Sequence, residues 1–135
     1  MKAKPQFLIV DDNRMNRSML GHLLSPFGQC QEAVNGQEAV DCYEQAKGEN
    51  RLYDLIFMDV VMPVMDGNMA VAKIRQTERD SGLHPVEVVM ISALHEGEDI
   101  EASRAAGASL YLAKPVKEKS IYELLNQLGY QRRVD

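Results

Sequence analysis

Five side chains that can bind a metal ion or a phosphate stand at the ends of short apolar runs in this sequence. They are Asp11, Asp12, Asp59, Ser92 and Lys114. Converging carboxylates raise one another's pKa, and a hard divalent cation and an ammonium group would relieve their repulsion. A carboxylate in such a place can act as a nucleophile and form an aspartyl phosphate. The five residues therefore predict magnesium-dependent phosphoryl transfer, a reaction that depends mainly on positioning and charge neutralisation.

Asp59 is the best candidate for the nucleophile. Asp11 and Asp12 are adjacent and can share one Mg²⁺ ion, directly or through water, whereas Asp59 stands alone after its own apolar run. The metal ion would cover one phosphoryl oxygen and Lys114 a second. Ser92, together with a backbone N–H group, would cover the third.

The elements that would position these residues alternate along the chain. Apolar runs predict strands over Phe7–Val10, Leu55–Met58, Val86–Ile91 and Ser109–Leu112, and Gln29–Val34 is a weaker strand candidate. An amphipathic stretch follows each strand, and the best strands are apolar throughout, which is typical of parallel strands covered by helices on both faces. The pattern predicts a doubly wound α/β fold. Sites in such folds form outside the carboxyl ends of the strands, where these polar residues stand.

Some local features of the helices are also predicted. The first helix should bury an apolar face made of Met15, Met19, Leu20, Leu23, Leu24 and Phe27. Asn35-Gly36 indicates a turn before the second helix. The fourth helix is expected from about Glu96 to Ala106, with Gly107 as its left-handed cap.

Composition narrows the classes of function. The chain has 135 residues, which predicts a single domain over residues 1–135, and its net charge is -5. An acidic chain is poorly suited to nucleic acid, because binding to the backbone needs Lys and Arg. The apolar run Phe7–Val10 is too short for a signal peptide or a membrane span, so we expect a cytoplasmic protein without membrane contact. Cys30 and Cys42 lack metal-binding spacing, and we expect two reduced thiols.

The sequence resembles the receiver domains of response regulators, the phosphorylation switches of two-component signal transduction. The segments that carry the resemblance are Val10-Asp11-Asp12-Asn13, Met58 to Gly67, Ser92-Ala93, Gly107-Ala108, Tyr111 and Lys114-Pro115. The resemblance implies a flavodoxin-like (βα)5 sandwich with a five-stranded parallel sheet of order 2-1-3-4-5. It also implies a receiver domain with its core over residues 6–130 and no output domain.

The resemblance assigns a role to each site residue. Asp59 corresponds to the phosphoacceptor and Lys114 to the phosphate-binding lysine. Asp11 and Asp12 correspond to the metal-binding pair, with Asp12 as the more direct ligand. The backbone carbonyl of Val61 would be a further ligand of the Mg²⁺ ion.

The resemblance further implies a switch. Ser92 corresponds to the switch hydroxyl and Tyr111 to the switch aromatic residue, and the bond before Pro115 is expected to be cis, a form seen almost only before proline. The surface of the fourth helix, fifth strand and fifth helix would then change for a downstream protein partner. Val61 and Leu94, both apolar near the site, predict a long-lived phosphoryl group.

The implied partners are a histidine kinase or a histidine phosphotransfer protein as phosphodonor. The chain would be a signalling domain and not an enzyme with its own substrate, and either a monomer or a phosphorylation-linked dimer. Three alternatives stay open. The chain could be a receiver domain from a hybrid histidine kinase, a binding module that has lost phosphorylation, or a magnesium-dependent aspartyl-phosphate phosphohydrolase. Val61 argues against the last, because such hydrolases usually carry a second Asp at this position.

Overall fold

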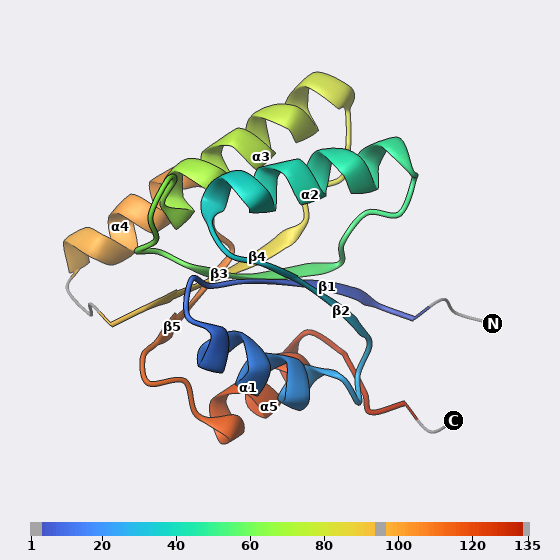
Figure 1. The fold of residues 1–135 in the computed structure, drawn as a ribbon, viewed down its shortest axis with the longest axis vertical. Helices are drawn as coiled ribbons and strands as arrows, with labels where there is room; N and C mark the ends of the chain where they lie inside the picture. Colours follow the sequence, from blue (N-terminus) through green and yellow to red (C-terminus); the bar gives the residue numbers. More distant parts are fainter. Residues whose placement is uncertain (1–3, 94–96, 134–135) are drawn as a thin grey trace.

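The computed structural model describes residues 4–93 and 97–133, except for the side chains of residues 97–99. Five strands and five helices alternate along them (Figure 1). The strands are β1 (Gln6–Val10), β2 (Gln29–Ala33), β3 (Leu55–Asp59), β4 (Glu87–Ser92) and β5 (Leu110–Ala113). The helices are α1 (Arg14–Leu24), α2 (Gly36–Gly48), α3 (Gly67–Ser81), α4 (Gly97–Ala106) and α5 (Glu118–Gln127).

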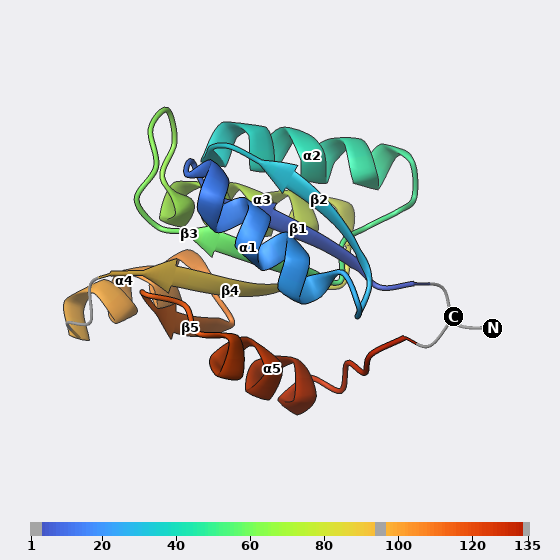
Figure 2. The same cartoon turned by 60° about the horizontal axis from the view of Figure 1, so that its bottom comes forward.

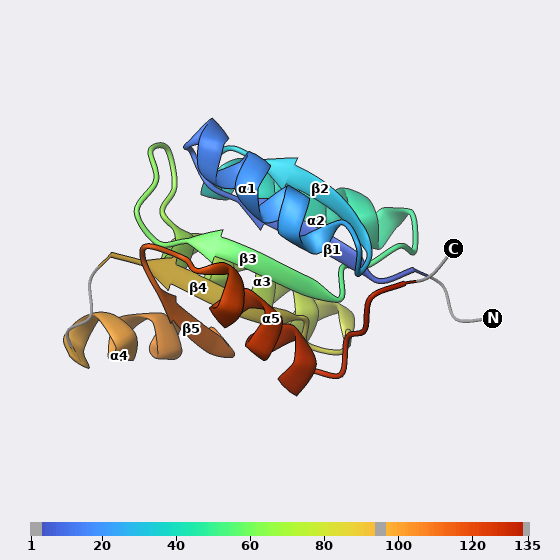
Figure 3. The same cartoon turned by 90° about the horizontal axis from the view of Figure 1, so that it is seen from below.

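The strands form one parallel sheet of order β2-β1-β3-β4-β5, as the resemblance implied. Helices α1 and α5 cover one face, and α2, α3 and α4 cover the other (Figures 1 and 3). All residues of the central strand β3 are buried, whereas the edge strand β2 buries only Ala33. This difference explains why β3 is apolar up to Asp59 and why the sequence of β2, QCQEA, is the weakest strand signal.

Each face of the sheet has its own hydrophobic core. Leu8, Ile56 and Met90 pack toward α2 and α3, where Ile74 lies fully buried. Phe7, Phe57 and Val89 pack toward α1 and α5 in the second core. Successive residues of a strand point to opposite faces, so one apolar run supplies both cores. The expected doubly wound architecture is confirmed.

Three helices at the carboxyl edge of the sheet begin with side-chain caps. The Oδ1 atoms of Asn13, Asn35 and Asp66 accept hydrogen bonds from the N–H groups three residues later, at 3.0, 2.8 and 2.8 Å. Each cap of this kind stabilises a helix by about 1 kcal/mol. The prediction of a turn at Asn35-Gly36 was therefore too coarse, because Asn35 is the N-cap and Gly36 the first residue of α2.

The predicted apolar face of α1 was partly wrong. Leu20, Leu23 and Leu24 are buried, but Met15 is 81% exposed and Met19 is 39% exposed. Both lie in the first two turns of α1, toward the carboxyl edge of the sheet, whereas the buried leucines lie farther along the helix. The three-and-four periodicity reports the direction in which a side chain points, and it carries no information about where the sheet beneath it ends.

Two other local predictions are confirmed, and a third falls partly outside the described residues. Gly107 has a φ of 115°, so the expected positive φ is confirmed. Cys30 and Cys42 are free and half-buried, as expected. Helix α4 begins at Gly97, and Leu94 and Glu96 lie outside the described residues. Across the ranges that the structure describes, no helix is long and apolar enough to cross a membrane.

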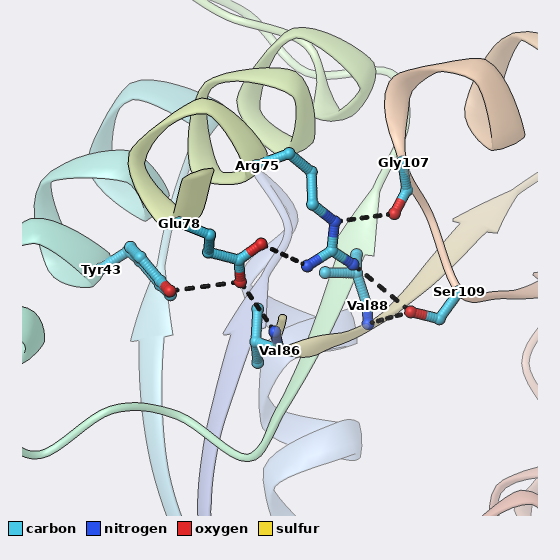
Figure 4. Close-up of polar contacts among 7 residues, drawn as sticks. All are labelled: Tyr43, Arg75, Glu78, Val86, Val88, Gly107 and Ser109. Atoms are coloured by element: carbon cyan, nitrogen blue, oxygen red, sulfur yellow. Dashed lines mark hydrogen bonds and ion pairs between the residues drawn. The ribbon is translucent and has the colours of Figure 1, made fainter. Parts of the chain in front are cut away.

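A buried carboxylate ties α3 to its neighbours (Figure 4). Glu78 is 3% exposed and accepts a hydrogen bond from the Tyr43 hydroxyl at 3.2 Å and one from the Val86 N–H at 2.7 Å. Its other oxygen pairs with Arg75 at 2.8 Å. Tyr43, Arg75, Glu78 and Val86 are called the Glu78 cluster below. The cluster joins α2, α3 and the residue before β4.

Arg75 extends this cluster to the turn between α4 and β5 (Figure 4). Its Nε donates to the Gly107 carbonyl at 2.9 Å, and an Nη donates to the Ser109 hydroxyl at 3.4 Å. The same hydroxyl accepts a hydrogen bond from the Val88 N–H at 3.2 Å. A Cβ on Gly107 would lie 2.7 Å from the Arg75 Cγ, so the turn packs directly against the arginine stem.

Candidate functional site

The carboxyl edge of the sheet brings the five predicted site residues together. Asp59 is the last residue of β3 and Ser92 the last of β4. Asp11 directly follows β1, and Lys114 directly follows β5. Because β1, β3, β4 and β5 are neighbours and parallel, their ends lie at the same edge. The edge is on the left of Figure 1, where α1, α2 and α3 also begin.

The three aspartates form a compact acidic cluster. One carboxylate oxygen from each of Asp11, Asp12 and Asp59 lies within 4.8 Å of the others. Asp11 is 2% and Asp59 is 3% exposed, while Asp12 faces solvent. The Lys114 ammonium lies 3.1 Å from the Asp59 Oδ2 atom. This arrangement places one cation beside the carboxylate that the sequence predicts to be the nucleophile.

The surroundings of Asp59 favour its neutral form. Burial is the main cause that raises the pKa of Asp59, and the charges of Asp11 and Asp12 raise it further. The hydrogen bond and the charge of Lys114 act in the opposite direction, but the net direction is upward. One lysine therefore does not compensate for burial and two neighbouring carboxylates, and a further cation would be favourable here.

The donor atoms of the cluster fit a Mg²⁺ ion. Mg²⁺ prefers oxygen ligands, usually one or two carboxylates together with water and phosphate oxygens. Asp11, Asp12 and Asp59 offer such oxygens at one place. Asp12 is the exposed member of the three, so solvent reaches the cluster there. Val61 lies in the loop after β3, with its side chain 66% exposed. The role of its carbonyl as a ligand stays a prediction.

The residues expected to form the switch occupy the neighbouring strands. Ser92 is 2% exposed, and its carbonyl accepts the Lys114 N–H at 2.8 Å. Tyr111 is half-buried on β5 and lines a cavity of about 230 Å³ beside α4. The Lys114–Pro115 peptide bond is cis, as the resemblance implied.

A larger groove opens beside the site. Asp11 and Lys114 line one side of a space of about 370 Å³ between α1 and the connection from β5 to α5. Apolar side chains make up much of its remaining wall, among them Met19, Leu20 and Val116. The groove therefore joins the charged site to an apolar surface.

Sequence reasoning missed the backbone packing behind Asp59. The Gly67 N–H donates to the Val60 carbonyl at 2.7 Å, and a Cβ on Gly67 would collide with the Asp59 carbonyl oxygen. Only glycine allows α3 to start so close to β3. The Asp66-Gly67 pair was the available signal, but by itself it predicted only a turn.

Hydrogen bonds from the start of α1 hold Asp11 in place. The Asn13 N–H donates to the Asp11 Oδ1 at 2.8 Å, and Arg17 donates to the Asp11 carbonyl at 2.7 Å. Arg17 also pairs with Glu32 of β2 at 3.0 Å. The sequence contained no signal for Arg17, because its partners depend on how α1 crosses the sheet.

Comparison with known proteins identifies the family of this fold. The family model of the response regulator receiver domain matches residues 7–126. The chain belongs to this family. As a receiver domain it is a module of two-component signal transduction, as the resemblance in its sequence implied.

Individual relatives agree with this assignment. The receiver domain is 33% identical to the chemotaxis protein CheY of Halobacterium salinarum, over 91% of this chain and 95% of the relative. It is also 33% identical to the hybrid signal transduction histidine kinase I of Dictyostelium discoideum, of which it spans only 7%. Among solved structures, the receiver domain of Ssk1, crystallised with the histidine phosphotransfer protein Ypd1 of Saccharomyces cerevisiae, is 31% identical. Its TM-score is 0.85, and the match covers 96% of this chain and 91% of that one.

Proposed function

We propose that this receiver domain accepts a phosphoryl group on Asp59 from a phosphohistidine of a histidine kinase or a histidine phosphotransfer protein. The observation that carries the proposal is the buried Asp59 carboxylate, with Lys114 3.1 Å away and two further carboxylates within 4.8 Å. The kind of donor is supported by the Ssk1 receiver domain, which was crystallised with a histidine phosphotransfer protein. A carboxylate can form an aspartyl phosphate, and phosphoryl transfer depends mainly on positioning and on neutralising the charge of the transferred group.

The transfer exchanges one bond of phosphorus for another. A carboxylate oxygen of Asp59 attacks the phosphorus atom, the P–O bond forms, and the P–N bond to the donor histidine breaks. The imidazole leaves with the electron pair of that bond. Lys114 is close enough to Asp59 to bind an oxygen of the transferred group, and the Ser92 hydroxyl lies on the next strand end. Their donors would hold the charge that develops on these oxygens.

Asp11, Asp12 and Asp59 would hold a Mg²⁺ ion in this receiver domain, with the Val61 carbonyl as a further ligand. When bound, the ion supplies positive charge to the phosphoryl oxygens. Asp11 is preorganised for this role, because its carboxylate accepts a hydrogen bond from the Asn13 N–H and its carbonyl one from Arg17. The charge on three neighbouring acids is the reason that transfer should need the ion.

Phosphorylation would then bias a switch. A phosphoryl group adds about two negative charges and three acceptor oxygens to Asp59. Ser92 would move toward these oxygens and vacate space. Tyr111, which lines the cavity beside α4, would fill that space by turning inward. The surface of α4, β5 and α5 would change for a downstream protein. Couplings of this kind are typically about 1–3 kcal/mol, so the change is a shift between two populations.

Labelling with a small donor tests the proposal. The protein is incubated with acetyl phosphate, with and without Mg²⁺, and its intact mass is measured. We expect the mass of one phosphoryl group, in the presence of Mg²⁺ and in no sample of Asp59→Asn. Asp41→Asn, an exposed aspartate on α2, is the matched control and should label like the wild type. Absence of label in every sample would leave a receiver-shaped binding module.

A further inference from the structure

Helix α4 is attached to the receiver domain differently from the other helices. It lies at the end of its helix layer, next to α3 (Figure 2). Helices α1, α3 and α5 each bury an apolar side chain completely, among them Leu24, Ile74 and Leu125. The side chains described on α4 are those of residues 100–106, and of these only Ser103 is buried, at 1% exposure. In this part of α4 the buried anchor is therefore polar.

The Ser103 hydroxyl is paired with the start of α3. It donates a hydrogen bond to the Oδ1 atom of Asn68 at 2.9 Å. Asn68 is the second residue of α3 and follows Gly67, whose backbone packs against the carbonyl oxygen of Asp59. The bond therefore ties α4 to the point where α3 meets the strand that carries Asp59. One neutral hydrogen bond contributes less to stability than a buried leucine or isoleucine side chain, so this tie is weak.

The carboxyl end of α4 is held more firmly. Arg75 donates to the carbonyl of Gly107, the residue after α4, and the buried Glu78 holds Arg75 in turn (Figure 4). Ser103 lies one helical turn before this anchor, a distance of about 6 Å along the helix. A movement of α4 would therefore be a rotation about its carboxyl end. Such a rotation would stretch the bond from Ser103 to Asn68 while Gly107 stays in place.

The surroundings of α4 leave space for this rotation. Ser103 and Tyr111 line the same cavity of about 230 Å³, together with Ile100 and Leu110. The cavity lies between α4 and β5, so on this side the helix is not packed against core side chains. Elements with few buried apolar contacts are the ones that move most easily in folded proteins.

We propose that the hydrogen bond between Ser103 and Asn68 is a latch that favours the unphosphorylated conformation of the receiver domain. The inference rests on the proposed phosphorylation of Asp59 and adds an element of its regulation. Ser92 ends β4 and the next helix, α4, begins at Gly97, so a displacement of Ser92 toward the phosphoryl group pulls on the amino end of α4. The bond is made before this pull and is broken after it. It therefore opposes switching and limits the fraction of active molecules before phosphorylation.

A latch and a purely structural bond have different thermodynamic consequences. A structural bond is present in both conformations, so its loss destabilises both equally and shifts nothing between them. A latch stabilises only one conformation. Its removal must strengthen the binding of any ligand that prefers the other conformation, because the two equilibria are linked.

Binding of beryllofluoride, a stable analogue of the phosphoryl group, tests the latch. Its dissociation constant in saturating Mg²⁺ is measured by calorimetry on the wild type, Ser103→Ala, Asn68→Ala and the double variant. Asn68 is half-buried, so its amide can bind water once the Ser103 hydroxyl is gone. Ser18→Ala is the matched control, because Ser18 is an exposed serine inside α1 and the same change raises helix propensity there. Asp59→Asn reports any binding away from the site.

We expect Ser103→Ala and Asn68→Ala each to bind beryllofluoride roughly three- to fivefold more tightly than the wild type, as for one neutral hydrogen bond lost from one of two conformations. The double variant should bind no more tightly than either single variant, because both changes remove the same bond. Ser18→Ala should bind like the wild type. The fall in melting temperature caused by Ser103→Ala should shrink when both proteins are saturated with beryllofluoride.

Several results would overturn the inference. Unchanged or weaker binding in the single variants would leave a purely structural bond. A gain in only one of two folded single variants, or gains that add in the double variant, would show that the bond between these residues is not the cause. If the wild type neither binds beryllofluoride nor accepts label from acetyl phosphate, the proposed phosphorylation of Asp59 is refuted, and the latch with it. The two failures are thus distinguished by the behaviour of the wild type.

Discussion

Two buried carboxylates of the receiver domain have the same exposure and opposite surroundings. Asp59 and Glu78 are each 3% exposed, and each lies beside a cation, Lys114 at 3.1 Å and Arg75 at 2.8 Å. Glu78 also accepts hydrogen bonds from the Tyr43 hydroxyl and the Val86 N–H. Asp59 instead faces two further carboxylates at the acidic cluster. Burial alone therefore does not distinguish a structural acid from a reactive one.

The difference lies in how completely the protein compensates each charge. At Glu78 every described donor comes from the fold itself. Burial, and then the charge of Glu78, raise the pKa of Tyr43, so its hydroxyl stays protonated and remains a donor. At Asp59 the fold leaves the pKa raised. An under-compensated carboxylate has a reason to react with an electrophile or to bind a metal ion, and such groups cluster at functional sites.

The largest effect is expected at the Glu78 cluster. Glu78→Ala leaves Arg75 and the Val86 N–H without their partner, and loss of one member of a buried ion pair costs about 3–5 kcal/mol. We expect the free energy of unfolding, measured with urea, to fall by about this amount, while acetyl phosphate still labels Asp59 in the folded fraction. Because the ion pair is coupled, Glu78→Ala combined with Arg75→Met should cost less than the sum of the single changes. Additive losses would show that the pair is not the source of the effect.

Magnesium should stabilise the folded protein through the acidic cluster at Asp59 and not through Glu78. At a concentration of ten times its dissociation constant, Mg²⁺ should raise the free energy of unfolding by about 1.4 kcal/mol, if it binds the folded state alone. The effect follows from the excess negative charge at Asp11, Asp12 and Asp59. Thermal melts with and without EDTA measure it. The same gain in Asp59→Asn combined with Asp12→Asn would place the ion elsewhere, whereas Glu78→Gln should not alter the gain.

Neutralising Asp59 should stabilise the metal-free protein. Asp59→Asn removes a charge that burial and two carboxylates disfavour, and we expect the free energy of unfolding at pH 7 in EDTA to rise by about 1 kcal/mol, within the range usual for relieving a strained active site. The matched change Glu78→Gln should lower it. A loss of stability in Asp59→Asn would mean that Lys114 compensates Asp59 more completely than its raised pKa indicates.

The gain from Asp59→Asn should depend on pH. Because the folded-state pKa of Asp59 lies above its ordinary value of 3.8, the folded protein binds more protons than the unfolded chain between these two pKa values. Asp59 therefore destabilises the wild type progressively as the pH rises from below 3.8 through the folded pKa. The difference between Asp59→Asn and the wild type should be smallest at acidic pH and grow to a plateau. A difference that shrinks with rising pH would reverse the assigned direction.

Several elements of this receiver domain could be predicted from local sequence. The apolar runs that became β1 and β3 are unbroken, and the run that became β4 contains one polar residue, Glu87. All three end at polar residues, and their positions were predicted to within one residue. The strand order came from the resemblance and is confirmed. Parallel strands align their carboxyl ends, and this geometry explains why Asp59, Ser92 and Lys114 could be assigned to one site before any coordinates.

Other features could not be predicted, for reasons that differ. The exposure of Met15 depends on where the sheet ends beneath α1. The Glu78 cluster joins Tyr43 to a residue 35 positions away, a contact that no local pattern reports. The left-handed Val64 opposes its own backbone preference, because Pro63, Met65 and Gly36 hold the loop in place. In each case tertiary contacts override the local signal.

The alternation of strands and helices, and the polar residues at the strand ends, could be read from the amino-acid sequence, because both follow from side-chain periodicity and chain order. The contrast between the under-compensated Asp59 and the satisfied Glu78 arises from the packing of the folded chain. That distinction depends on the distances from each carboxylate to donors and charges on other elements, and these distances exist only once the helices have packed against the sheet.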